Sequence, residues 1–266
     1  MDLELTGRLA VVTGGSRGIG KATAFALARE GANVALIARN MADATIAAQE
    51  IASTTAQRVQ AYNADTSSDE AVRSAFAELA TDFGRIDILV NCAAQAAGQA
   101  PAPKFTEIHG ENFWAEINVK VLGYIRCAQA ATPHMKKAGW GRIINISGLA
   151  ARSTGSIIGT IRNISVAALT KNLADELGPS GINVTCVHPG ITRTEKTAGV
   201  LQQRAAASHS TPEQVERRIA DSNTIRHLVT AEEVANVVAF LASPKSIAIN
   251  GDAIAAGGGM PGAIYY

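Results

Sequence analysis

The amino-acid sequence predicts an α/β fold, a doubly wound parallel sheet of seven strands with helices on both faces. Short apolar runs rich in β-branched residues alternate with longer helical stretches, which is the pattern of parallel strands joined by right-handed crossovers. Each run has the length of a strand that is buried on both faces. Of the 266 residues, 47% are hydrophobic and only 5% aromatic, so small side chains allow helices to pack closely on the sheet.

The apolar runs are the predicted strands, and they cover residues 10–13, 33–38, 58–62, 86–91, 142–147, 182–187 and 253–255. The predicted helices between them cover residues 19–30, 42–54, 69–83, 111–137, 164–177 and 230–242. Gly31 is expected to close the first helix, because glycine adopts the left-handed conformation common at helix ends. Ser67 or Ser68, and Thr230, precede acidic first turns and are the expected N-caps of the third and last helices.

Residues 192–225 depart from this alternation, because they are polar and alanine-rich and follow a strand directly. We interpret them as a helical insertion above the carboxyl ends of the strands, where ligands bind in such sheets. The chain is otherwise expected to be one domain covering residues 1–266.

Composition excludes several classes of protein. The formal net charge of +1 gives no basic surface for nucleic acid, and no stretch is long and apolar enough to span a membrane. Cys92, Cys127 and Cys186 are an odd number at wide spacing, which favours free thiols in a cytoplasmic protein over disulfides or zinc. The histidines are scattered without ligand spacing, so no metal is expected.

A glycine-rich turn joins the first strand to the first helix. Its sequence is Thr13-Gly14-Gly15-Ser16-Arg17-Gly18-Ile19-Gly20. Glycines at this place permit a tight turn and let backbone N–H groups approach phosphate oxygens at the start of a helix. The turn therefore predicts a three-layer Rossmann-type fold that binds a dinucleotide through Gly14, Ser16, Arg17, Gly18, Ile19 and Gly20.

The second strand ends Leu36-Ile37-Ala38-Arg39-Asn40, at the position that reads the adenosine ribose. An acid there selects NAD, whereas a base accommodates the 2′-phosphate of NADP. Arg39, with Arg17 in the glycine turn, therefore favours NADP(H) over NAD(H). The alternative is that both arginines are solvated surface residues.

Further motifs follow the later strands in order. They are Asn63-Ala64-Asp65, Asn91-Cys92-Ala93-Ala94, Ile117-Asn118-Val119 and His188-Pro189-Gly190-Ile191-Thr192. With the glycine turn, they make the whole chain resemble the single-domain form of the short-chain dehydrogenase/reductase superfamily. The resemblance implies a small-molecule substrate and a homo-oligomer, a dimer or tetramer. It places Asp65 at the adenine ring, Asn91 and Ala93 at the nicotinamide ribose, and Pro189, Gly190 and Thr192 at the carboxamide.

The resemblance also implies a catalytic Asn, Ser, Tyr and Lys. Asn118 matches the Asn, but Gly159 and Asn163 stand at the Tyr and Lys positions. A shift of register cannot restore that pair, because no Tyr or Lys lies between Lys137 and Lys171. Asn163 can still hydrogen-bond the nicotinamide ribose, without the charge of a lysine.

Other side chains are candidates for the missing chemistry. Ser147 ends the fifth strand and is either a catalytic or substrate contact, or a strand-end hydroxyl bonded to the backbone. Arg152 and Arg162 are candidates for substrate binding, with exposure to solvent as the alternative. His188 is a candidate acid, with packing as the alternative. Tail tyrosines Tyr265 and Tyr266 are a further candidate source of a phenol.

Three functions follow from these residues. The first is an NADP(H)-dependent oxidoreductase that acts on a carbonyl or alcohol of a small organic molecule through a rebuilt active site. The second is a lyase or isomerase that uses the same pocket without net redox chemistry. The third is an inactive NADP(H)-binding protein, a sensor or an oligomer partner, which the glycine at position 159 supports directly.

Overall fold

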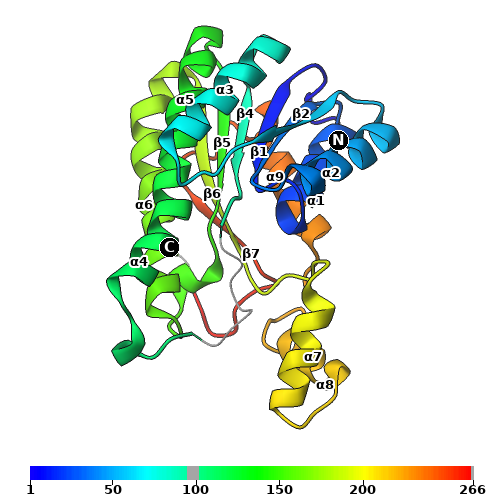
Figure 1. Cartoon of the computed structure of the whole chain (residues 1–266), viewed down its shortest axis with the longest axis vertical. Helices are drawn as coiled ribbons and strands as arrows, with labels where there is room; N and C mark the ends of the chain where they lie inside the picture. Colours follow the sequence, from blue (N-terminus) through cyan, green and yellow to red (C-terminus); the bar gives the residue numbers. More distant parts are fainter. Residues whose placement is uncertain (95–101, 265–266) are drawn as a thin grey trace.

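The sheet is the centre of the molecule. A computed structural model describes residues 1–94 and 102–264 (Figure 1). The strands are β1 (Leu9–Thr13), β2 (Asn33–Ala38), β3 (Val59–Asn63), β4 (Ile88–Asn91), β5 (Gly141–Ile146), β6 (Ile182–Pro189) and β7 (Ala253–Ala256). They form one sheet in the order β3-β2-β1-β4-β5-β6-β7, with every neighbouring pair parallel. The predicted doubly wound sheet is thus confirmed.

Helices cover both faces of this sheet, as Figure 1 shows. On one face lie α1 (Gly18–Arg29), α2 (Met41–Thr55) and α9 (Ala231–Ala242), and their apolar sides form one core cluster with the strands. On the other face lie α3 (Asp69–Phe83), α5 (Gly123–Ala138) and α6 (Ile157–Leu177), which form a second cluster. The layers are those expected of a parallel sheet with right-handed crossovers.

The expected ends of the helices are also confirmed. Gly31 follows α1 with a φ of +91°, in the left-handed region. Ser68 is the residue that caps α3, since its hydroxyl accepts the N–H of Ala71 at 3.2 Å. Thr230 caps α9 and forms a reciprocal capping box with Glu233.

Two helices differ from the prediction. The helix expected over residues 111–137 consists of α4 (Gly110–Ile117), a π-helical turn η2 (Asn118–Leu122) and α5. Such wide turns often mark functional sites, because they change the direction of the side chains that they carry. Helix α6 begins at Ile157, well before the predicted residue 164, because Ser156 caps it by accepting the N–H of Gly159 at 3.1 Å.

Helices α7 (Thr197–Ala207) and α8 (Pro212–Ala220) lie within residues 192–225 and stand beyond the carboxyl ends of the strands (Figure 1). They pack on each other through Leu201, Ala205, Val215 and Ile219. Short 3₁₀ segments join other elements: η1 (Phe105–Glu107), η3 (Leu149–Arg152), η4 (Gly178–Ser180) and η5 (Pro244–Ser246). No helix in the described part of the chain is long and apolar enough to cross a bilayer.

Candidate active site

A large cavity opens where the strand order reverses, beside the carboxyl ends of β1 and β4. This is the place where open α/β sheets bind ligands. The glycine turn, the ends of β2, β5 and β6, and helices α6 and α7 contribute to its walls. Its volume of about 1090 Å³ exceeds the upper end of ordinary small-ligand sites, so the cavity has room for more than one small molecule.

The glycine turn is packed against itself and against the segment that follows β4. Gly14 has a φ of +66°, and a Cβ added to Gly20 would lie 2.2 Å from the Gly14 carbonyl oxygen. Thr13 Oγ1 accepts the N–H groups of Cys92 and Ala93 at 3.0 and 3.1 Å. The turn is therefore held in one shape, with its backbone close to the cavity.

The first turn of α1 has the features of an anion-binding site. No side chain caps it at Arg17, and it contains no acidic residue. Instead, the N–H of Gly18 donates to both carboxylate oxygens of Glu195, at 3.0 and 3.3 Å. Because helix N-termini bind phosphates and carboxylates alike, the residues here fit the pyrophosphate of a dinucleotide, which would take the place of Glu195.

Two arginines line the adjoining end of the cavity. Arg17 comes from the glycine turn and Arg39 from the end of β2. Arg39 is 63% exposed, and its Nη1 lies 3.8 Å from Asp65 Oδ2. Asp43 lines the same end, with its carboxylate accepting the side-chain amide of Asn40 at 2.9 Å. A phosphate at this end would meet an accessible guanidinium.

Most of the residues expected from the sequence to bind the cofactor line this cavity. They are Gly14, Ser16, Arg17, Gly18, Ile19, Gly20, Arg39, Ala93, Asn163, Pro189, Gly190 and Thr192. Asp65 and Asn91 are not part of the lining. Asp65 Oδ1 accepts both the N–H and the hydroxyl of Ser67, whereas Asn91 is buried and donates to Asn145 Oδ1 at 2.9 Å.

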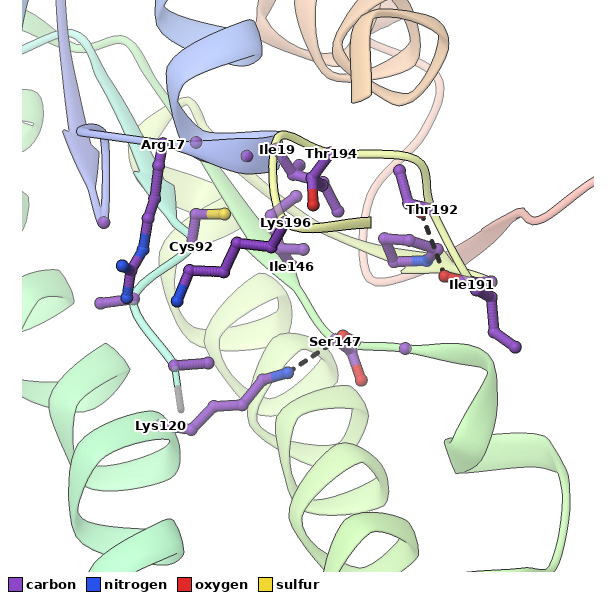
Figure 2. A pocket seen from close by; sticks show the side chains of 18 of the residues that line it. Arg17, Ile19, Cys92, Lys120, Ile146, Ser147, Ile191, Thr192, Thr194 and Lys196 are labelled. Carbon is purple, nitrogen blue, oxygen red and sulfur yellow. Dashed lines mark hydrogen bonds between the residues drawn. The ribbon is translucent and has the colours of Figure 1, made fainter. Parts of the chain in front are cut away.

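A polar cluster forms the floor of the other end of the cavity. Ser147 follows β5, and its hydroxyl donates to the backbone carbonyl of Asn163 in α6 at 2.9 Å. Lys120 Nζ donates to Asn163 Oδ1 at 2.9 Å and to the Ser147 carbonyl at 3.0 Å. Figure 2 shows the Lys120 side chain reaching toward Ser147 from the neighbouring helix. The predicted residues Ser147 and Asn163 are therefore brought together by a lysine that the sequence analysis did not single out.

A signal for Lys120 is present in the sequence. It is the only charged residue in the apolar run Ile117-Asn118-Val119-Lys120-Val121-Leu122. Tyr124 and Ala128, one and two turns later, are buried against the core. Helical periodicity therefore places Lys120 on the core face, where an unpaired lysine is rare.

Burial, together with the nearby positive charge of Arg162, lowers the pKa of Lys120 to about 7. Arg162 itself lines the cavity and forms an ion pair with Glu116 of α4. Its Nε has no hydrogen-bond partner among the residues that the structure describes. Lys120 and Arg162 thus line the floor of the cavity, and Glu116 pairs with Arg162 from outside the lining.

The other predicted catalytic and substrate residues lie outside the lining. Asn118 Nδ2 donates to the Ser67 carbonyl at 3.4 Å, and Arg152 Nη2 donates to the Ala253 carbonyl at 2.9 Å. His188 is 1% exposed, and burial lowers its pKa to about 4. The imidazole is thus neutral at pH 7 and cannot act as an acid there.

Gly159 lies one helical turn before Asn163 in α6. Its backbone N–H is tied to the cap residue Ser156, and a Cβ at this position would lie 2.9 Å from Ser156 Oγ. Tyr265 and Tyr266 lie outside the described residues, as does part of the 94–107 loop.

Comparison with known proteins matches this architecture. A family model described as enoyl-(acyl carrier protein) reductase matches residues 14–261. The short-chain reductase protein NovJ of Streptomyces niveus is 35% identical over 257 residues, covering 95% of this chain and 94% of NovJ. L-Sorbose reductase of Gluconobacter frateurii, solved with NADPH and L-sorbose, has a TM-score of 0.93 at 27% identity, over 99% of this chain and 100% of that one.

A further solved structure, an NAD⁺-bound xylitol dehydrogenase, has a TM-score of 0.87 at 27% identity, over 96% of this chain and 100% of that one. These matches include the glycine turn, the sheet and the segments that line the cavity. They agree with a parallel sheet whose carboxyl edge holds an anion-binding turn and a polar cluster. The chain therefore belongs to the short-chain dehydrogenase/reductase family of oxidoreductases.

Proposed function

We propose that this chain is an NADP(H)-dependent oxidoreductase that interconverts a carbonyl and an alcohol on a small organic molecule through an atypical active site. The observation that carries this proposal is the continuity of the cavity. One cavity joins the anion-holding turn at Gly18 to the polar cluster of Lys120, Ser147 and Asn163. A dinucleotide bound along it would bring its reactive ring to the cluster.

The preference for NADP(H) rests on the charge at the adenosine end. Arg17 and Arg39 line it, and the residue that ends β2 is not an acid. Guanidinium groups bind a phosphomonoester well, whereas NAD-selective sites use a carboxylate on the ribose hydroxyls. The bound NADPH of L-sorbose reductase supports this assignment, and the NAD⁺ of xylitol dehydrogenase makes NADH the necessary comparison.

When bound, the nicotinamide ring supplies or accepts a hydride. The chain binds the pyrophosphate at the first turn of α1 and holds the nicotinamide ribose with the amide of Asn163. Lys120 presents an N–H to the substrate oxygen, and Ser147 lies beside it with its own hydroxyl donated to the Asn163 carbonyl. Leu149, Val200, Leu201, Ile219 and Met260 line the same cavity. Their apolar side chains favour a largely apolar substrate and exclude water from the reacting atoms.

The site is atypical because α6 carries Gly159, which has no side chain, and Asn163 where the family resemblance implies Tyr and Lys, and of the two only Asn163 lines the cavity. The proton that accompanies the hydride must then come from a group outside α6 or from water. This leaves an inactive nucleotide-binding protein as the second candidate, favoured by the same glycine.

We also propose that the chain forms a homo-oligomer. Trp114 of α4 and Leu122 of η2 are large exposed apolar side chains, as are Ile157, Ile161 and Ile164 of α6. Helices α4 and α6 contact one another, so these side chains belong to neighbouring elements. Burial against a second copy would remove this apolar surface from water.

Nucleotide binding followed by turnover tests the proposal. Protein fluorescence would give the dissociation constants of NADPH and NADH, and nicotinamide absorbance would follow a panel of ketones and aldehydes. We expect tighter binding of NADPH and measurable reduction of an apolar carbonyl. Tight NADPH binding without reduction of any carbonyl would instead establish the inactive binding protein, and failure to bind either nucleotide would reject both.

A further inference from the structure

Lys120 is an ionisable group that the cofactor motifs do not account for. Its side chain is 4% exposed and lies on the core face of the helix, in line with the buried Tyr124. The wide turn η2 contains it, at the end of the helix that meets the cavity. Its ammonium therefore points into the cavity and not toward the outer surface of the protein.

The contacts of this ammonium hold it in place without neutralising it. Nζ donates to Asn163 Oδ1 at 2.9 Å and to the Ser147 carbonyl at 3.0 Å, and both acceptors are uncharged. An ammonium has three N–H bonds, so one is left for a further acceptor. Lys120 also lines the cavity, and Figure 2 shows its side chain pointing toward Ser147. A substrate oxygen held beside Ser147 and Asn163 would therefore be an acceptor within reach.

We propose that the Lys120 ammonium is the proton donor for carbonyl reduction and that the neutral amine is the proton acceptor for alcohol oxidation. This rests on the proposed function. In reduction, a hydride from the reduced nicotinamide forms the new C–H bond, and the carbonyl π electrons move to oxygen. One N–H bond of Lys120 breaks as the O–H bond forms, directly or through one water. Lys120 is left as the amine and regains a proton from solvent.

Charged and titratable groups surround Lys120 on every side. They are Glu116 of α4, Arg162 of α6, Cys92 after β4, and Cys186 and His188 of β6. Burial and Arg162 lower the pKa of Lys120 from 10.5 to about 7, and the two cysteines and Glu116 oppose that shift. A general acid works best when its pKa lies near the working pH, which an ordinary lysine does not satisfy.

The two directions of the reaction should therefore respond to pH in opposite ways. Reduction needs the ammonium, so its rate should fall as pH rises through about 7. Oxidation needs the amine, so its rate should rise over the same interval. Both profiles are best measured in a single turnover, so that product release does not hide the proton-transfer step.

Two substitutions of Lys120 distinguish a role in proton transfer from a role of its positive charge alone. Lys120→Met removes the ammonium at nearly constant volume, and Lys120→Arg keeps the positive charge but does not titrate near neutrality. Both should lower the single-turnover rate by about 10²- to 10⁴-fold, the usual contribution of a general acid. Both should keep NADPH affinity close to native. Lys136→Met is the matched control, because Lys136 is an exposed lysine at the far end of the same helix and should behave as native.

A second measurement needs neither turnover nor bound nucleotide. Carbon NMR of labelled lysine in the full chain would show one side chain titrating near pH 7, assigned by its loss in Lys120→Arg. A Lys120 that titrates near the ordinary 10.5 would overturn the inference even if Lys120→Met failed to fold.

The outcomes separate this inference from the proposed function. Native turnover that survives in Lys120→Arg, or that shows no inflection near neutrality, rejects Lys120 as the acid while the oxidoreductase stands. NADPH binding with no reduction of any carbonyl by the native chain rejects the oxidoreductase, and the role of Lys120 with it.

Discussion

Lys120 of η2 and Asn163 of α6 meet at one place on the floor of the cavity. Lys120 Nζ lies 2.9 Å from Asn163 Oδ1, so the ammonium is already beside the place where the family resemblance expects a lysine. Asn163 is suited to this neighbour because its amide oxygen accepts the N–H bond while its NH₂ group stays available to the cavity. A lysine at position 163 would instead place two ammonium groups together in a buried site.

Asn163→Lys should therefore destabilise the native chain by on the order of 2 kcal/mol, through repulsion and the lost hydrogen bond. Adding Lys120→Met should recover most of that loss, because a single ammonium then remains at the floor of the cavity. Denaturant unfolding of the native, single and double variants gives the coupling between the two positions. Additive effects of the two substitutions would contradict this account of the site.

Arg39 is the residue at which the choice of nucleotide is tested most directly. Arg39→Ala should weaken NADPH binding by about 10- to 100-fold, since a hydrogen bond to a charged group contributes about 1.5–3 kcal/mol. NADH has no 2′-phosphate, so its affinity should hardly change. Titration of both nucleotides by protein fluorescence measures the difference, with Arg58→Ala, an arginine outside the cavity lining, as the control. Equal losses for the two nucleotides would assign Arg39 a general role instead.

At the scale of elements, helix α1 and the segment after β6 meet at the anion-binding turn. The Gly18 N–H donates to both oxygens of the Glu195 carboxylate, and Glu195 lies two residues before the start of α7. A nucleotide phosphate and this carboxylate compete for the same helix N-terminus. Binding of nucleotide is therefore expected to release the start of the α7–α8 segment from α1.

Glu195→Gln should tighten NADPH binding by about 3- to 10-fold, because it removes a competing anion and a negative charge that would repel phosphate. Calorimetric titration of NADPH measures the change. Glu213→Gln, an exposed carboxyl on α8, is the matched control and should bind as the native chain does. Weaker binding in Glu195→Gln would show that the carboxylate supports the bound state.

At the scale of the whole molecule, the carboxyl ends and the amino ends of the strands differ in structure. The carboxyl ends of the strands border the cavity. At their amino ends lies Asp87, whose side chain is buried. Its Oδ2 accepts the N–H of Leu9 at 2.8 Å, and Arg85 donates to both of its oxygens, at 2.6 and 2.7 Å. Asp87 thereby ties the start of β1 to the start of β4, the parallel pair of strands at which the strand order reverses.

Asp87→Ala should lower stability by about 3 kcal/mol, because it leaves a buried backbone N–H and an arginine without their partner. For a chain of this size the melting temperature should fall by about 5–10 °C. Thermal unfolding measures this, and nucleotide affinity of the folded variant should be unchanged because Asp87 lies at the opposite edge. Asp175→Ala, which removes one partner of an exposed pair with Lys171, should cost no more than about 0.5 kcal/mol.

The sequence by itself predicted the strands and helices of the sheet and most of the residues at the glycine-turn end of the cavity. Strand runs, caps such as Thr230 and the turn from Gly14 to Gly20 are local patterns, in which the interacting residues are close along the chain. Arg17 and Arg39 were identified for the same reason, since each follows a strand whose end fixes its place.

Only the tertiary structure decided which side chains meet at the other end of the cavity, beside Ser147 and Asn163. Lys120 meets Ser147 and Asn163 across 27 and 43 residues of sequence, through the packing of the wide turn η2 against α6. The same packing turns the Asn118 amide toward Ser67 and buries His188 away from the cavity. Such contacts depend on how helices pack and how a buried side chain is oriented, and neither follows from a local sequence pattern.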